Sequence, residues 1–218
     1  MIIFDCNGVL VDSEPIATTV ASDAFQTVGI DIAPEVVARY FTGRRPADMF
    51  ADIEAATGLT LPPDFASIVA AETLKRFRQE LQATPHAAHA LTWLRGPKCV
   101  ASSSNLERVQ VSLEATNLLR FFDKNVFSAS EVASGKPAPD LFRYAAACMG
   151  IQPRDCLVVE DSAAGITAAV AADMTAIGFV GGSHAMPNLG SQLTAAGASA
   201  VFADMRALKA VVFDLRGY

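Results

Sequence analysis

Short apolar runs typical of β-strands alternate with helix-like stretches along most of this chain, and no other sequence feature constrains the fold as much. A strand, a helix and a second strand in succession form a parallel pair, so the alternation predicts an α/β fold with a doubly wound (Rossmann-like) parallel sheet. The predicted strands cover Ile2–Phe4, Cys99–Ser102, Asn125–Phe127, Leu157–Glu160, Thr175–Phe179 and Ala200–Phe202.

One region breaks this alternation. Between about residues 14 and 83 the apolar residues follow helical spacing only, as Leu74, Phe77 and Leu81 do, and prolines stand at plausible helix starts. We therefore expect a helical cap domain at 14–83, inserted into an α/β core made of residues 1–13 and 84–218. A second run near the end, Val211–Gly217, imitates the opening strand but continues an amphipathic pattern, which predicts a helical tail.

Composition excludes several functional classes. The 218 residues carry a formal net charge of −6 and no basic block, which argues against nucleic acid or an anionic membrane as the main partner. No apolar run reaches membrane-spanning length, no signal segment opens the chain, and the four cysteines are scattered without a CxxC pair. We expect a cytoplasmic protein with reduced thiols, a monomer with a dimer left open.

The first predicted strand ends on a carboxylate, Asp5, with Asn7 and Gly8 directly after it. Glycine lets the chain turn sharply at this point. A carboxylate at the end of a buried strand is poorly solvated unless a cation faces it, so Asp5 is a candidate metal ligand or catalytic nucleophile.

Two later strands also end abruptly in polar residues. The serines and Asn105 that follow Ala101 would suit an anion cradle, although Ser104 or Asn105 could equally serve as a helix cap. Glu160 and Asp161 form a carboxylate pair at the end of an apolar strand. Asp161 could cap the next helix, but that interpretation leaves the second carboxylate unexplained.

Between these two sites, Lys136 stands on a loop stiffened by Pro137 and Pro139. A lone lysine on a loop is commonly just solvated. In a doubly wound sheet, however, ligands bind at the carboxyl ends of strands, where Lys136 would join Asp5, the hydroxyls and the acidic pair. A carboxylate nucleophile, a hydroxyl, a lysine and a cation site together suit phosphoryl transfer.

In order and spacing these motifs resemble those of the haloacid dehalogenase superfamily along nearly the whole chain. The first motif of that superfamily, Asp-x-Asp-Gly-x-Leu-x-Asp-Ser, matches at Asp5, Gly8, Leu10, Asp12 and Ser13. CVASSSN resembles the second motif, SGKPAPDLF the third and VVEDSAAG the fourth. In style they are nearest to the β-phosphoglucomutase and phosphoglycolate phosphatase-like members. The resemblance implies a Mg²⁺-dependent phosphatase that hydrolyses a small phosphorylated metabolite through an aspartyl phosphate.

The resemblance also implies a role for each matching residue. Asp5 would attack phosphorus, Ser102 would hold a phosphoryl oxygen, and Lys136 would pair with Asp5 and the phosphoryl group. The implied Mg²⁺ ligands are the Asp5 side chain, the Asn7 backbone carbonyl and Asp161, with Glu160 nearby or acting through water. The implied substrate contacts are Ser103, Ser104 and Asn105, and the cap loop Gly43, Arg44 and Arg45, which could instead be a solvated connection.

Position 7 departs from the family pattern, because the family has an aspartate there that protonates the leaving oxygen and activates the acceptor. An amide can do neither near neutral pH. Asn7 could be an engineered substitution, the native residue of a slow enzyme, or a sign that turnover has been lost and phosphate binding kept. Deamidation of the Asn7–Gly8 pair would restore the aspartate.

A sugar phosphomutase and a non-catalytic binder of phosphorylated ligands remain the alternatives. The mutases of this group carry a histidine shortly after the first motif. The corresponding stretch, Glu14–Thr19, has none, and the three histidines of the chain, His86, His89 and His184, lie elsewhere without metal-ligand spacing. We therefore favour a hydrolase.

Overall fold

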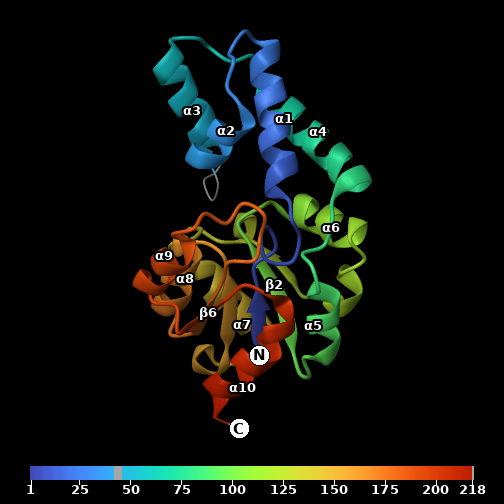
Figure 1. The fold of residues 1–218 in the computed structure, drawn as a ribbon, viewed down its shortest axis with the longest axis vertical. Coiled ribbons are helices and arrows are strands. Elements are labelled where there is room, and N and C mark those ends of the chain that lie inside the picture. Colours follow the sequence, from blue (N-terminus) through green and yellow to red (C-terminus); the bar gives the residue numbers. More distant parts are fainter. Residues whose placement is uncertain (42–45, 218) are drawn as a thin grey trace. The chain divides into compact units, whose positions relative to one another are not determined.

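The computed structural model describes residues 1–41 and 46–217 and divides into two compact units. Met1–Asp12 and Gln82–Tyr218 form one unit, here the α/β unit, and Ser13–Leu81 form the other, here the helical unit (Figure 1). The predicted substrate loop Gly43, Arg44 and Arg45 lies outside the described residues.

The α/β unit is built on a six-stranded sheet in which every pair of neighbours is parallel. Its order is β3-β2-β1-β4-β5-β6, so the direction of winding reverses between β1 and β4, the position where doubly wound sheets bind ligands. This confirms the predicted fold class. The strands are β1 (Ile2–Phe4), β2 (Lys98–Ser102), β3 (Val126–Ser128), β4 (Leu157–Glu160), β5 (Thr175–Phe179) and β6 (Ala200–Phe202).

Register brings the carboxyl ends of the central strands to one level. Phe4 of β1 is aligned with Val100 of β2 on one side and with Val159 of β4 on the other. The residues that follow these three strands therefore meet at one edge of the sheet. The central strands are buried on both faces, which is why they are continuous apolar runs instead of alternating ones.

Helices cover the sheet of the α/β unit. Apolar side chains of α7, α8 and α9, among them Phe142, Ile166 and Leu193, share one buried core with residues of the strands. The helices are α5 (Ala87–Trp93), α6 (Leu106–Ala115), α7 (Asp140–Cys148), α8 (Ala163–Ala171), α9 (Leu189–Ala195) and α10 (Leu208–Arg216), with short 3₁₀ turns at Leu119–Phe121, Ala129–Glu131, Pro153–Asp155 and Met205–Ala207.

The last helix confirms the helical interpretation of the C-terminal run that imitates the opening strand. In α10, Arg216 donates a hydrogen bond to the carbonyl oxygen of Met1 at 3.3 Å, and Figure 1 shows both chain ends at the same end of the α/β unit. Across the described residues, no helix combines the length and the apolar character that crossing a membrane would demand.

The helical unit consists, in its described part, of four helices and no strand. They are α1 (Glu14–Thr27), α2 (Pro34–Phe41), α3 (Pro46–Thr57) and α4 (Phe65–Glu80). Three phenylalanines form its centre. The ring of Phe25 lies 5.9 Å from that of Phe50 and 5.1 Å from that of Phe65, and the latter two are 5.3 Å apart, centroid to centroid. Such close aromatic packing adds stability beyond the area it buries.

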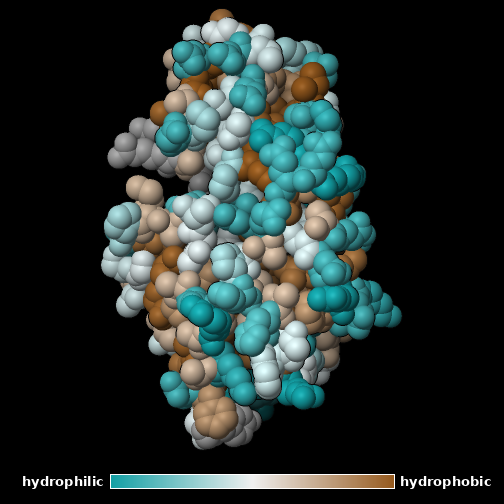
Figure 2. Space-filling model, turned by 45° about the vertical axis from the view of Figure 1, so that its right-hand side comes forward, coloured by the Kyte–Doolittle hydropathy of each residue, from teal (hydrophilic) through white to brown (hydrophobic). Residues whose placement is uncertain are grey.

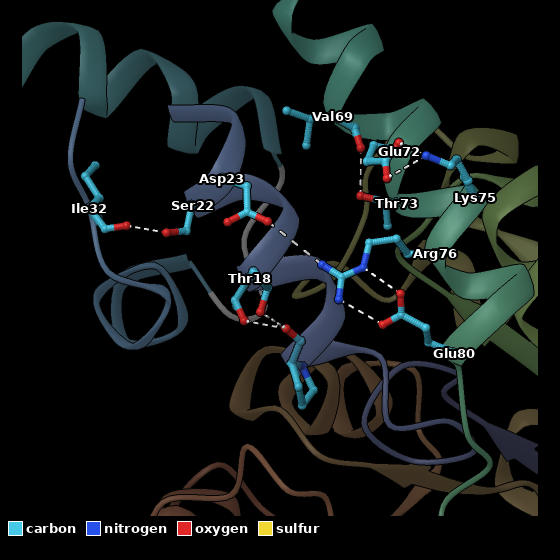
Figure 3. Close-up of polar contacts among 12 residues, drawn as sticks. Thr18, Ser22, Asp23, Ile32, Val69, Glu72, Thr73, Lys75, Arg76 and Glu80 are labelled. Atoms are coloured by element: carbon cyan, nitrogen blue, oxygen red, sulfur yellow. Dashed lines mark hydrogen bonds and ion pairs between the residues drawn. The ribbon is translucent and has the colours of Figure 1, made fainter. Parts of the chain in front are cut away.

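Polar side chains lie on the outer side of the α1–α4 pair. Arg76 of α4 pairs with Glu80 one turn later at 2.8 Å and lies 4.0 Å from Asp23 of α1 (Figure 3). Figure 2 shows hydrophilic side chains gathered over this side of the helical unit, where Glu72 and Lys75 of α4 also pair at 3.0 Å. The two helices thus bury one apolar face and expose a charged face.

The chain leaves the α/β unit and returns to it at neighbouring points. Val11 forms an antiparallel bridge with Ala83. On either side of it, the Asp12 amide donates to the Gln82 carbonyl at 3.0 Å and the Thr84 amide donates to the Leu10 carbonyl at 2.9 Å. The two connecting segments are therefore held together by backbone hydrogen bonds that belong to the α/β unit.

Replacing Phe25 by alanine tests the aromatic centre of the helical unit. Phe25 has no exposed surface, so the change leaves a cavity, and we expect a loss of about 3–5 kcal/mol in the free energy of unfolding, measured by urea titration. Phe213, which is 52% exposed, is the matched control, and Phe213→Ala should cost less than about 1 kcal/mol. Equal effects from the two variants would contradict this description of the core.

Candidate active site

A buried lysine joins two carboxylates at the edge of the sheet where β1, β2 and β4 end. Lys136 Nζ lies 2.6 Å from Asp5 Oδ1 and contacts Glu160 Oε1. It also donates to the carbonyl oxygen of Ala101 in β2, at 3.1 Å. The Lys136 side chain is only 4% exposed, so it is not the solvated loop lysine that its sequence context alone would favour.

The loop before α7 brings Lys136 to this position. Its ammonium group lies 5.0 Å from the centre of the Phe142 ring, which packs against the sheet as part of the buried core. α7 begins at Asp140, directly after Pro139, as the proline predicted. The start of this helix and the aromatic ring together hold the end of a long side chain in place, and these contacts offset the conformational entropy that the side chain loses.

Glu160 uses both of its carboxylate oxygens within the protein. Oε1 faces Lys136, and Oε2 accepts hydrogen bonds from the amides of Asp161 and Ser162, at 3.1 and 3.0 Å, and from the Ser162 hydroxyl at 2.8 Å. Both oxygens of Glu160 therefore already have partners in the protein, and Glu160 holds Lys136 in place. Its place near a bound metal, directly or through water, stays a prediction.

The first turn of α8 closes over Glu160. A Cβ atom on Gly165 would overlap the Glu160 carboxyl group, so only glycine fits at this position. The helix cap is Ser162, whose hydroxyl accepts a hydrogen bond from the Gly165 amide at 3.0 Å. Asp161, the other cap candidate of the sequence, is therefore not needed for that purpose.

Asp161 instead faces a histidine that sequence reasoning had set aside. Its Oδ2 atom lies 2.9 Å from His184 Nε2, and the two side chains are 11% and 10% exposed. His184 follows β5 through the segment Val180–Ser183. The sequence holds a signal for this residue, because β5 also ends abruptly in small and polar residues, as β2 and β4 do.

The hydroxyl side of the site comes from the end of β2. Ser102 is buried, and its hydroxyl accepts a hydrogen bond from the Ser104 amide at 3.2 Å. Asn105 caps α6, because its side-chain oxygen accepts from the Arg108 amide at 2.8 Å. Ser103 is exposed. Asn105 was predicted as a substrate contact, with a helix cap as the alternative. In the structure it is the cap.

The Asn7 side chain connects the loop after β1 to the serines that follow β2. Its Nδ2 atom donates to Ser104 Oγ at 2.7 Å, while its Oδ1 atom is buried without a hydrogen-bond partner in the described residues. A buried amide oxygen left without a donor is costly, typically by about 1–3 kcal/mol. Asn7 therefore presents an unsatisfied acceptor beside Asp5, which a ligand with a hydroxyl or a bound water would satisfy.

Charge in the site is unbalanced. Burial raises the pKa of Asp5 well above its usual range and the negative charges of Glu160 and Asp161 add to this effect, whereas Lys136 opposes it. Burial by itself would lower the pKa of Lys136, but Asp5 and Glu160 outweigh it and raise that pKa. Two carboxylates contact one ammonium group, and Asp161 adds a third negative charge near Asp5. Oxygen donors of this kind suit a divalent cation such as Mg²⁺.

Cys6, between Asp5 and Asn7, does not take part in this chemistry. Its side chain is fully buried, and burial together with the charge of Asp5 raises the pKa of its thiol. A thiol held in its neutral form is a poor nucleophile, so Cys6 serves as a buried residue of the core.

The sequence model of one protein family, described as haloacid dehalogenase-like hydrolases, matches residues 1–173. This chain belongs to that family. Its relatives include the 6-phosphogluconate phosphatase of Escherichia coli K12, 31% identical over 194 residues, which are 88% of each protein. The fructose-1-phosphate phosphatase YqaB of the same organism is 29% identical, with 81% of this chain and 94% of the relative covered.

Solved structures agree with this assignment. A conserved haloacid dehalogenase-like protein from Agrobacterium tumefaciens C58 is 34% identical, with a TM-score of 0.87 and coverage of 99% of this chain and 98% of the other. A hydrolase of the family from Deinococcus radiodurans R1, solved with bound phosphate and sodium, is 30% identical, with a TM-score of 0.81 and coverage of 98% and 94%.

The fold should protect Asn7 from deamidation, although an asparagine before glycine is the most reactive context. Deamidation requires the Gly8 nitrogen to attack the Asn7 side chain, yet the Gly8 amide donates to the Val11 carbonyl at 2.8 Å and the Asn7 amide donates to Ser104. Breaking such contacts by local opening, at about 1.4 kcal/mol or more, slows the reaction by at least about tenfold. We therefore expect Asn7 to deamidate at least about tenfold more slowly in the native protein than in concentrated urea at the same pH, as measured by peptide mass spectrometry. Equal rates would contradict it.

Proposed function

We propose that this hydrolase removes phosphate from a small phosphorylated sugar through a phosphoaspartate formed on Asp5. The observation that carries the proposal is the buried Asp5–Lys136–Glu160 cluster at the carboxyl ends of β1, β2 and β4. A lysine held in this way compensates charge on a nucleophilic carboxylate and on an incoming phosphoryl group. Phosphoryl transfer depends on such positioning and neutralisation.

The reaction would proceed in two displacements. One oxygen of the Asp5 carboxylate attacks phosphorus while the bond from phosphorus to the sugar oxygen breaks, and the sugar leaves as an alcohol after taking up a proton. Water then attacks the same phosphorus, the bond to Asp5 breaks, and inorganic phosphate leaves. Throughout, Ser102 would donate its hydroxyl hydrogen to a phosphoryl oxygen.

Mg²⁺ would be held by the side chains of Asp5 and Asp161 and by the backbone carbonyl of Asn7, as the family resemblance implies. Within the described residues, no three His, Cys, Asp or Glu side chains are grouped as a metal site, so such a site would need the backbone oxygen. When bound, the cation would supply positive charge beside these carboxylates, which favours the ionised form of Asp5.

Asn7 sets the limit on the rate. Its side chain can donate a hydrogen bond from Nδ2 and accept one at Oδ1, but it can neither release nor take up a proton near neutral pH. The proton for the leaving alcohol must then come from water, which makes the enzyme slow or restricts it to good leaving groups. The substrate class follows the relatives, whose names include 6-phosphogluconate and fructose-1-phosphate phosphatases.

This function is tested by measuring phosphate release from a panel of sugar phosphates, nucleotides and phosphoglycolate in the presence of Mg²⁺. We expect turnover on a sugar phosphate that falls by at least about a thousandfold in Asp5→Asn, because the nucleophile is lost. Chelation of the metal should likewise abolish it. Asp214→Asn, on the exposed face of α10, is the matched control and should keep wild-type activity. Turnover that survives Asp5→Asn or chelation would refute the mechanism.

Restoring the family's aspartate tests the role assigned to Asn7. We expect Asn7→Asp to raise kcat by about 10²–10⁴-fold, the usual contribution of a general acid and base. The matched control is Asn188→Asp, at an exposed position before α9, which should leave kcat unchanged. If Asn7→Asp shows no turnover on any substrate while phosphate still binds, the protein is a binder of phosphorylated ligands and not an enzyme.

A further inference from the structure

We propose that His184 is a positioning residue of this site, which holds the Asp161 carboxylate through Oδ2 and so orients it for the divalent cation. The inference rests on the proposed function, because it assigns Asp161 to the metal. It concerns a residue outside the four motifs, on the segment between β5 and α9. Carboxylates that bind metals are themselves held by hydrogen bonds, and removing the partner typically weakens metal affinity.

The contact between the two side chains has one chemical interpretation. His184 Nε2 lies 2.9 Å from Asp161 Oδ2, and an ionised carboxylate only accepts hydrogen bonds, so Nε2 carries the hydrogen and donates it. Both side chains are about nine-tenths buried, which strengthens a charge-assisted hydrogen bond and restricts the rotation of the carboxylate. One oxygen of Asp161 is thereby committed to the protein.

Two glycines make room for the imidazole ring. A Cβ atom on Gly182 would lie 2.7 Å from His184 Cε1 and 2.9 Å from the Gly8 carbonyl oxygen. A Cβ atom on Gly8, whose φ is +79°, would crowd His184 Cε1 and overlap the Asp161 carboxylate. The ring therefore fits into a slot between the loop after β1 and the segment after β5, at a point where neither backbone can carry a side chain.

A second contact anchors the segment that carries His184. Asp12, the last acidic residue of the first motif, accepts hydrogen bonds through Oδ1 from the hydroxyl and the amide of Ser183, at 2.7 and 3.4 Å. The Ala185 amide donates to the Gly182 carbonyl at 3.0 Å and closes a turn with Ser183 and His184 at its centre. Asp12 thus connects the first motif to the histidine that faces Asp161.

This arrangement assigns different tasks to the charged residues around Asp5. Lys136 is held between Asp5 and Glu160, whereas His184 holds Asp161. Loss of His184 should leave the fold and the lysine in place but let the Asp161 carboxylate rotate. The expected defect is weaker cation binding, and kcat should recover once Mg²⁺ is saturating.

Calorimetric titration of Mg²⁺ into the protein without substrate tests the proposal directly. We expect His184→Leu, which removes the donor and keeps apolar bulk, to weaken Mg²⁺ affinity by about 10–100-fold. His184→Gln, which can present an amide N–H at similar reach, should recover most of the lost affinity. His89→Leu, the same substitution at an exposed position of α5, is the matched control and should bind Mg²⁺ like the wild type. The melting temperature without metal shows whether each variant folds, and His184→Asn, too short to reach Asp161, replaces His184→Leu if the latter does not.

The outcomes separate this inference from the proposed function. Wild-type Mg²⁺ affinity in folded His184→Leu overturns the positioning role even when the enzyme hydrolyses phosphate, and so does the absence of Mg²⁺ binding by the wild type. Equal losses in His184→Leu and His184→Gln also overturn it, since the donor would not matter. Conversely, weaker binding in His184→Leu with recovery in His184→Gln supports it even if no substrate of the panel is hydrolysed.

Discussion

The site depends on one interaction, the burial of the Lys136 ammonium group between Asp5 and Glu160. Taking such charges out of water costs several kcal/mol for each ion, and this is offset only where the geometry is close and the remaining hydrogen bonds are satisfied. Here the Ala101 carbonyl and the donors around Glu160 satisfy them. The register of the three strands, the start of α7 and the glycine of α8 all serve to hold these groups at one point.

Much of this architecture could be predicted from the sequence, because strands buried on both faces are continuous apolar runs with sharp ends. Four of the predicted strands coincide with those of the structure, and the second and third differ by a residue at their ends. Caps were harder to assign. Whether Asp161 or Ser162 caps α8 depends on backbone angles, and Ser162 has the extended conformation that a cap needs, with φ −119° and ψ 144°. Neighbouring polar residues give no such information in the sequence.

His184 shows a different limit of sequence reasoning. Its partner, Asp161, is far away in the chain and belongs to another strand end, so no local spacing relates the two. Only the parallel pairing of β4 with β5 brings the segments that follow them together. The relation is topological, since the carboxyl ends of parallel strands share one edge of the sheet, and the small and polar residues after β5 belong to the same edge as those after β2 and β4.

The pairing of the two segments that flank the helical unit bears on how large the insert between them can be. Because backbone hydrogen bonds of the α/β unit already join Leu10 to Thr84 and Asp12 to Gln82, everything between them is a loop whose ends are closed in advance. The entropy of closing a flexible loop grows only slowly, by about 0.6 kcal/mol for each doubling of its length. The sheet should therefore tolerate inserts of very different size at this position, while the strand ends that carry Asp5, Lys136 and Glu160 stay where they are.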